Sequence, residues 1–216
     1  SFNFSGGAAL TGAPTIGRIA ALTSNFYATE RTEEVWAGQI FSNWSPNLKT
    51  SLAYSKIDLL QDSISPVTFP EVRIYGVPGI DANTGAAVPN GVVVFGTENS
   101  RHGNRINVQT ETYSASADYT MGRFTFTGGM DREEAGFLNL FRQSSYGVLG
   151  YTNVANFVAD TPFAFTRALV QTGFPIADVS EFEQTAIFGQ VKTELSPRFN
   201  FTLGLRYDWM GSAIPP

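Results

Sequence analysis

The feature that most limits how this chain can fold is a strict alternation of apolar and polar residues. From Phe199 to Trp209 (FNFTLGLRYDW), every second residue is large and apolar, and the residues between them are polar, small or charged. Successive side chains of a β-strand point to opposite faces. The segment therefore predicts a strand with one apolar face, made by Phe199, Phe201, Leu203, Leu205, Tyr207 and Trp209.

The same alternation occurs in five further segments, and tight turns join the segments in pairs. We expect antiparallel strands at Glu34–Asn43, Leu48–Ile57, Gln109–Met121, Phe124–Glu133, Thr185–Leu195 and Phe199–Trp209. Strands of globular proteins average roughly 5 to 6 residues. These segments are longer, and they reach the roughly 9 to 11 residues that a tilted strand needs to cross a bilayer.

Two long connections, Leu59–Asn107 and Ala135–Glu183, alternate with the tight turns. Soluble domains rarely contain irregular loops beyond about 12 to 15 residues, so a soluble β-sandwich fits poorly. Outer-membrane barrels combine short periplasmic turns with long extracellular loops. The predicted fold is therefore all-β, an antiparallel transmembrane β-barrel segment of about six long strands. Its apolar face would meet lipid, and its lumen-facing candidates are Asp118, Asp131, Lys192, Arg206 and Asp208.

Composition excludes several other classes of protein. Charged residues make up 15% of the chain and the net charge is −5, which argues against nucleic-acid binding. The absence of cysteine excludes disulfides and thiolate metal sites. No run approaches the roughly 20 apolar residues of a membrane helix, and the first ten residues show no signal peptide. No catalytic or phosphate-binding motif is present, so we expect neither an enzyme nor a cofactor.

The first long connection predicts a small hairpin of Phe69–Gly76 with Val92–Gly96. Asp81–Gly85 (DANTG) faintly resembles a calcium loop, but it lacks the bidentate glutamate, so a plain turn is favoured. His102, the only histidine, is expected at the surface. The run Asp131–Glu134 suits either a solvated rim or acid–base chemistry, and the rim is favoured.

The second long connection is rich in aromatic residues, most of which we expect to pack against one another. It predicts a short helix at about Asn153–Ala159 with Thr152 as its N-cap. A few residues of the two connections are candidates to face a ligand: Arg101, His102, Phe141, Arg142, Tyr146 and Tyr151.

Three stretches resemble the barrel of TonB-dependent outer-membrane receptors: FGTENSRHGN, TYSASADYTMGRFTFTGGMDREEAGFLNLFRQSSYGV and FGQVKTELSPRFNFTLGLRYD. The stretch FLNLFRQSSYGV resembles the Oar-like subgroup more narrowly. The resemblance extends from Thr32 to Met210. It implies a barrel of about 22 strands in the bacterial outer membrane. It also implies a plug domain that contacts the TonB complex, outer-membrane lipid around the barrel, and import driven by the inner-membrane proton gradient.

The chain departs from the pattern of these receptors, because it carries no recognisable plug, TonB box or regulatory-like domain. Six strands are too few to close even a barrel of about eight strands. We therefore expect residues 1–216 to be a partial barrel domain, an internal piece of a longer receptor. The predicted function is nutrient import through capture by the extracellular loops. The alternatives are a structural or adhesion barrel, whose loops bind a surface partner, and a passive porin.

Overall fold

The computed structural model describes residues 2–3, 10–15, 17–173, 175–196 and 198–214. The chain divides into two compact units, which we describe separately. The wall unit comprises Thr32–Leu60, Ile106–Leu138 and Asp178–Pro216, and the loop unit comprises Ser1–Arg31, Gln61–Arg105 and Asn139–Ala177. In the described part of the chain, no helix is long and apolar enough to cross a membrane.

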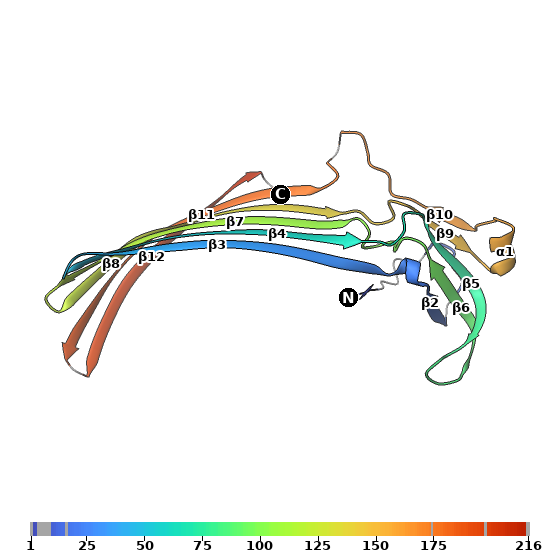
Figure 1. Cartoon of the computed structure of the whole chain (residues 1–216), viewed down its shortest axis with the longest axis horizontal. Coiled ribbons are helices and arrows are strands. Elements are labelled where there is room, and N and C mark those ends of the chain that lie inside the picture. The colour runs from blue at the N-terminus through green and yellow to red at the C-terminus, as the bar shows by residue number, and fades with distance from the viewer. Residues whose placement is uncertain (1, 4–9, 16, 174, 197, 215–216) are drawn as a thin grey trace. The chain divides into compact units, whose positions relative to one another are not determined.

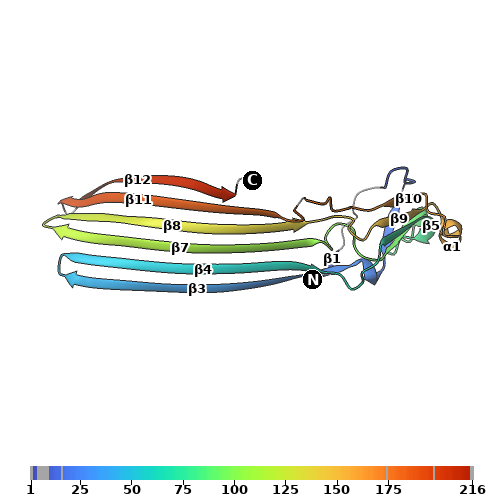
Figure 2. The same cartoon turned by 90° about the horizontal axis from the view of Figure 1, so that it is seen from above.

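Six long strands and the two-residue strand β1 form a seven-stranded sheet in the order β1-β3-β4-β7-β8-β11-β12. Figure 2 shows the six long ones side by side as three hairpins. Their bounds are β1 (Phe2–Asn3), β3 (Tyr27–Ser45), β4 (Leu48–Ile64), β7 (Asn104–Met121), β8 (Phe124–Phe141), β11 (Asp178–Ser196) and β12 (Phe199–Ile214). All six predicted strands are confirmed.

Each predicted strand continues beyond the end that we expected, on the side away from its tight turn. β4 runs to Ile64 and β7 begins at Asn104, while β8 runs to Phe141 and β11 begins at Asp178. The long connections are correspondingly shorter than Leu59–Asn107 and Ala135–Glu183. The prediction stopped where the apolar alternation fades, but the backbone pairing of the hairpins persists beyond that point.

The register between β11 and β12 keeps the two faces of the wall separate. Val191 pairs with Leu203 and Ile187 with Tyr207, whereas Lys192 pairs with Thr202. The apolar face carries large exposed side chains on all six strands, among them Trp36 (68%), Leu52 (54%), Tyr113 (42%), Met130 (47%), Ile187 (52%) and Leu205 (80%). Exposed apolar patches of this extent mark a surface that contacts another apolar phase. For a sheet of long alternating strands, that phase is the lipid of a membrane.

The loop unit contains a five-stranded sheet in the order β10-β9-β5-β6-β2, seen in Figure 1. Its strands are β2 (Arg18–Ala21), β5 (Glu71–Ile80), β6 (Ala87–Phe95), β9 (Val148–Tyr151) and β10 (Ala164–Thr166). β5 and β6 form the predicted hairpin. The sheet is mixed, because β2 pairs with β6, and β5 with β9, in parallel. Neither β2 nor these parallel pairings was predicted from the sequence.

Apolar residues pack in two clusters of this sheet. One joins Val72, Ile74 and Tyr151, and the other joins Tyr75, Val92 and Val94. Two phenylalanines of the second connection extend these clusters. The ring centres of Phe157 and Tyr151 are 5.3 Å apart, and those of Phe163 and Tyr75 are 5.7 Å apart. Among the aromatic residues of this connection, Tyr151 is buried and Phe163 packs on the core, so the expectation of packing is met in part. Five others remain at least 37% exposed, namely Phe137, Phe141, Tyr146, Phe157 and Phe165.

Two local predictions concern a helix cap and a turn. The helix forms as α1 (Val154–Val158), but its N-cap is Asn153, whose side chain accepts a hydrogen bond from the Asn156 amide at 2.8 Å. The expected cap, Thr152, was therefore wrong by one residue. The Asp81 carboxylate accepts hydrogen bonds from the amides of Asn83 and Thr84, so Asp81–Gly85 is the plain turn that was favoured.

Candidate functional site

The polar face of the wall unit carries a connected network of charged side chains. Asp131 accepts hydrogen bonds from Ser114 at 2.5 Å and from Arg206 at 2.6 Å. Arg206 also donates to Asp208 at 3.0 Å, and its guanidinium lies 5.9 Å from the ring centre of Phe188. Three of the five lumen-facing candidates are therefore linked across β8 and β12.

The other two lumen-facing candidates lie outside this network. Asp118 accepts a hydrogen bond from Thr127 at 2.6 Å. Lys192 stands opposite Thr202 in the pairing of β11 with β12. Both belong to the same alternating polar series as the linked residues, so the polar face of the wall extends over at least four strands.

The apolar face of the wall changes character at a similar level on neighbouring strands. On β4 and β7, the ring pair of Tyr54 and Tyr113, 5.2 Å apart, is followed by the ion pair of Lys56 and Glu111 at 3.8 Å. On β8 and β11, Met130 and Ile187 give way to Arg132, which pairs with Glu183 at 2.8 Å. We call this row of ion pairs the charged boundary, and it ends the apolar band of the wall.

The predicted rim at Asp131–Glu134 is divided between the two faces of β8. Arg132 and Glu134 pair with each other at 2.7 Å at the charged boundary. Asp131 lies on the opposite face with Arg206. The run therefore holds two separate sets of ion pairs, because alternate residues of a strand point to opposite faces.

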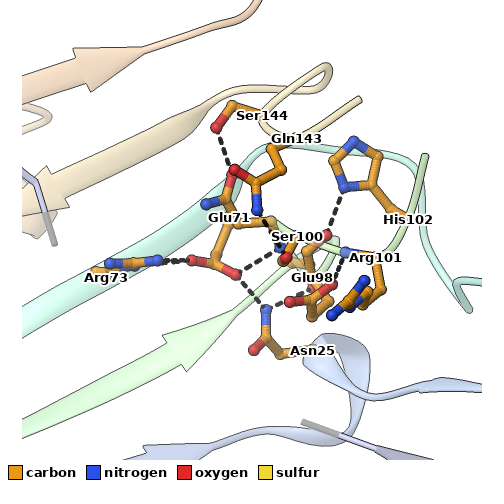
Figure 3. A network of polar contacts seen from close by, with 11 residues as sticks. Asn25, Glu71, Arg73, Glu98, Ser100, Arg101, His102, Gln143 and Ser144 are labelled. Atoms are coloured by element: carbon orange, nitrogen blue, oxygen red, sulfur yellow. Dashed lines mark hydrogen bonds and ion pairs between the residues drawn. The ribbon is translucent and has the colours of Figure 1, made fainter. Parts of the chain in front are cut away.

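In the loop unit, the segments 98–103 and 142–147 lie against each other, and we call their contact the seam (Figure 3). Its backbone bonds run from the Arg142 amide to the Gly103 carbonyl and from the Ser144 amide to the Asn99 carbonyl, at 3.0 and 2.9 Å. Side chains add further bonds, from Ser144 to Asn99, from Gln143 to Ser100, and between His102 and Ser145. Two segments that are some forty residues apart in sequence thus form one surface.

The seam brings together five of the six predicted ligand-facing residues. Arg101 lies over the ring of Phe141 at 5.3 Å, His102 contacts the ring of Tyr146 at 5.2 Å, and Arg142 belongs to the seam backbone. Tyr151 lies apart from them in the core, only 4% exposed, with its hydroxyl donating to Asp160 at 2.9 Å. Burial raises the pKa of Tyr151 above its ordinary value.

His102 is half-buried rather than fully exposed at the surface. Its Nδ1 is 2.6 Å from the Glu98 carbonyl oxygen, and its Nε2 contacts the Ser145 hydroxyl. Burial lowers the pKa of His102 below its ordinary value, and the nearby carbonyl and carboxylate of Glu98 oppose that shift. The imidazole is therefore neutral at pH 7, with Nδ1 donating to the carbonyl.

The loop unit also contains buried charges beneath the seam, which were not predicted from the sequence. Glu71 is 1% exposed and Arg73 is 5% exposed, and they form an ion pair at 2.6 Å. The second carboxylate oxygen of Glu71 accepts hydrogen bonds from Asn25 at 3.0 Å and from the Asn99 amide at 2.9 Å (Figure 3). The alternation in Glu71-Val72-Arg73 places both charges on one face of β5, which was the available signal.

Metal ligands do not gather in the described part of the chain, where no group of three His, Cys, Asp or Glu side chains could hold an ion. The family model described as TonB dependent receptor-like, beta-barrel matches residues 2–213. No curated protein and no solved structure matches the chain.

Proposed function

Because this chain belongs to the TonB dependent receptor-like β-barrel family, we propose that it forms part of an importer that captures a nutrient at the bacterial cell surface. The family implies the outer membrane, a lipid environment for the wall, and TonB as a partner. Capture by the loops, passage through the lumen and contact with TonB through a plug domain are the further steps of the proposal.

One observation carries the proposal, which is the opposite chemistry of the two faces of one sheet. The exposed apolar side chains suit hydrocarbon, where every backbone polar group must be paired within the protein. Asp131, Arg206 and Asp208, on the other face, suit a hydrated lumen that a polar solute crosses.

Capture of the nutrient is assigned to the seam and its surroundings. Arg101, Phe141 and Tyr146 place a cation and two partly exposed rings on one surface of the loop unit. Binding residues are often carried by loops that a rigid scaffold positions. Here the buried pair of Glu71 and Arg73 supplies the rigid support.

We assign the chain to the Oar-like subgroup on the stretch FLNLFRQSSYGV. This stretch covers the end of β8 and continues into the seam through Arg142 and Ser144. The subgroup resemblance therefore falls on the residues to which capture is assigned, which supports a shared mode of loop assembly within the subgroup.

Growth of deletion strains on a panel of single carbon, iron and cofactor sources tests the import proposal. A strain that lacks the receptor and a strain that lacks TonB should lose growth on the same source. Growth that depends on the receptor but not on TonB would indicate a passive porin. Loss of surface adhesion without any growth defect would indicate an interaction barrel.

A further inference from the structure

The loop unit contains a cavity of about 560 Å³ beside the seam. Its walls come from four strand ends and both seam segments. Six polar residues matter for its chemistry: Glu30, Asp62, His102, Asn104, Arg105 and Tyr146. The volume falls within the roughly 300 to 1,000 Å³ of small-molecule sites.

Charges in this cavity disfavour an anionic ligand. Arg105 is held by Asp62 through two bonds of 2.7 and 2.8 Å, so its charge is already balanced. His102 is neutral at pH 7. The carboxylate of Glu30 has no ion pair within the described residues, so the charge that remains in the cavity is negative.

Hydrogen-bonding groups and one aromatic ring dominate the rest of the lining. Tyr146 is 41% exposed, and neither its hydroxyl nor the side-chain amide of Asn104 has a partner in the described part of the chain. The buried hydroxyl of Ser65, in the cavity lining, also has no partner there. Free donors and acceptors suit hydroxyl groups, and an aromatic face suits the C–H groups of a sugar ring.

We propose that this cavity binds a neutral saccharide unit, with the ring of Tyr146 against the sugar and Glu30, Asn104 and Arg105 bonded to its hydroxyls. If the saccharide is the imported nutrient, this inference rests on the proposed import function.

Titration calorimetry on the purified full-length receptor in detergent tests the proposal. The probes are maltohexaose, laminarihexaose and cellohexaose, with the anionic oligomer hexagalacturonate for comparison. We expect saturable binding of at least one neutral oligosaccharide and weaker binding of hexagalacturonate.

Three variants separate the cavity from other surfaces. Tyr146→Ala should weaken binding roughly 3- to 10-fold, because an aromatic contact is lost. Tyr146→Phe should keep most of the affinity, and Leu169→Ala, 82% exposed and not part of the cavity lining, should keep all of it. Each variant must first show the heat-modifiable electrophoretic mobility of a folded barrel.

Two results would overturn the saccharide site: no neutral saccharide probe binds, or Tyr146→Ala binds as tightly as the unaltered receptor. The growth test reports separately on import. Saccharide binding without any TonB-dependent growth would leave the site standing and remove the import function. TonB-dependent growth without saccharide binding would support the import function and remove the saccharide site.

Discussion

Glu71 and Arg73 illustrate how single residues hold the loop unit together. Both are charged and almost fully buried. The carboxylate of Glu71 also accepts hydrogen bonds from the Asn25 side chain and from the Asn99 amide. Removing one member of such a pair leaves the other charge buried without compensation, which costs more than the pair itself contributes.

Glu71→Gln should therefore destabilise the loop unit by about 3 to 5 kcal/mol, the range for breaking a buried ion pair. Hydrogen exchange of the β5 amides would measure the change. Glu183→Gln is the matched control, because its ion pair with Arg132 is exposed and worth at most about 1 kcal/mol. Equal exchange rates in the two variants would contradict a supporting role for Glu71.

His102 makes the stability of the seam depend on pH. Its pKa is lowered in the folded protein, so the unfolded chain binds the proton more readily. The stabilisation is complete above the ordinary pKa of about 6.5 and is lost progressively as the pH falls below it. Exchange of the Arg142 and Ser144 amides, corrected for intrinsic rates, should show a seam less stable at pH 5 than at pH 7.5. His102→Gln should reduce this difference, and greater stability at pH 5 would refute the assignment.

At the scale of single strands, alternation decides which side chains meet lipid. Leu203 and Thr202 are neighbours in β12, yet Leu203 pairs with Val191 on the apolar face and Thr202 with Lys192 on the polar face. A charged side chain should be tolerated at position 202, on the polar face, but not at position 203, on the apolar face.

Leu203→Arg should impair folding into lipid vesicles, since a cation at the bilayer midplane costs about 2 to 4 kcal/mol. Thr202→Glu should be tolerated, because it places a carboxylate opposite Lys192. Thr202→Arg would oppose two cations, so glutamate is the better control. Folding yield from urea into vesicles, read by protease protection, measures both variants. Similar yields would show that the faces are assigned wrongly.

At the scale of the whole molecule, the seven-stranded sheet is open at both edges within the described residues. There, β12 pairs only with β11, and β3 pairs with β1 over two residues on its outer side. Unpaired backbone groups at an edge cost several kcal/mol each in hydrocarbon. Both edges therefore need further partner strands within a membrane.

The 216-residue chain expressed alone should consequently aggregate or fail to enter vesicles. Heat-modifiability on electrophoresis and resistance to trypsin would report a folded, inserted state. A protease-resistant monomer would show that these strands close on themselves, and cross-linked oligomers would show closure between copies.

The sequence by itself determined the strands of the wall and their hairpin pairing. Alternation at period two and turn residues such as Gly122 are local signals, and hairpin partners are neighbours along the chain. The two faces of β12, and the clustering of Asp131, Arg206 and Asp208 on the polar face, follow from that alternation. The Asp81 turn was likewise predicted, because an aspartate side chain caps its own turn.

Only the tertiary structure decided the loop unit and the sites within it. β2 pairs with Gly91–Val94 and β9 with Glu71–Ile74, both in parallel. No local pattern encodes such pairings, because parallel partners are joined by long connections rather than tight turns. The burial of Glu71, the core position of Tyr151 and the seam around His102 all depend on those distant pairings. A residue's burial is set by what packs over it, and here that is chain from elsewhere in the sequence.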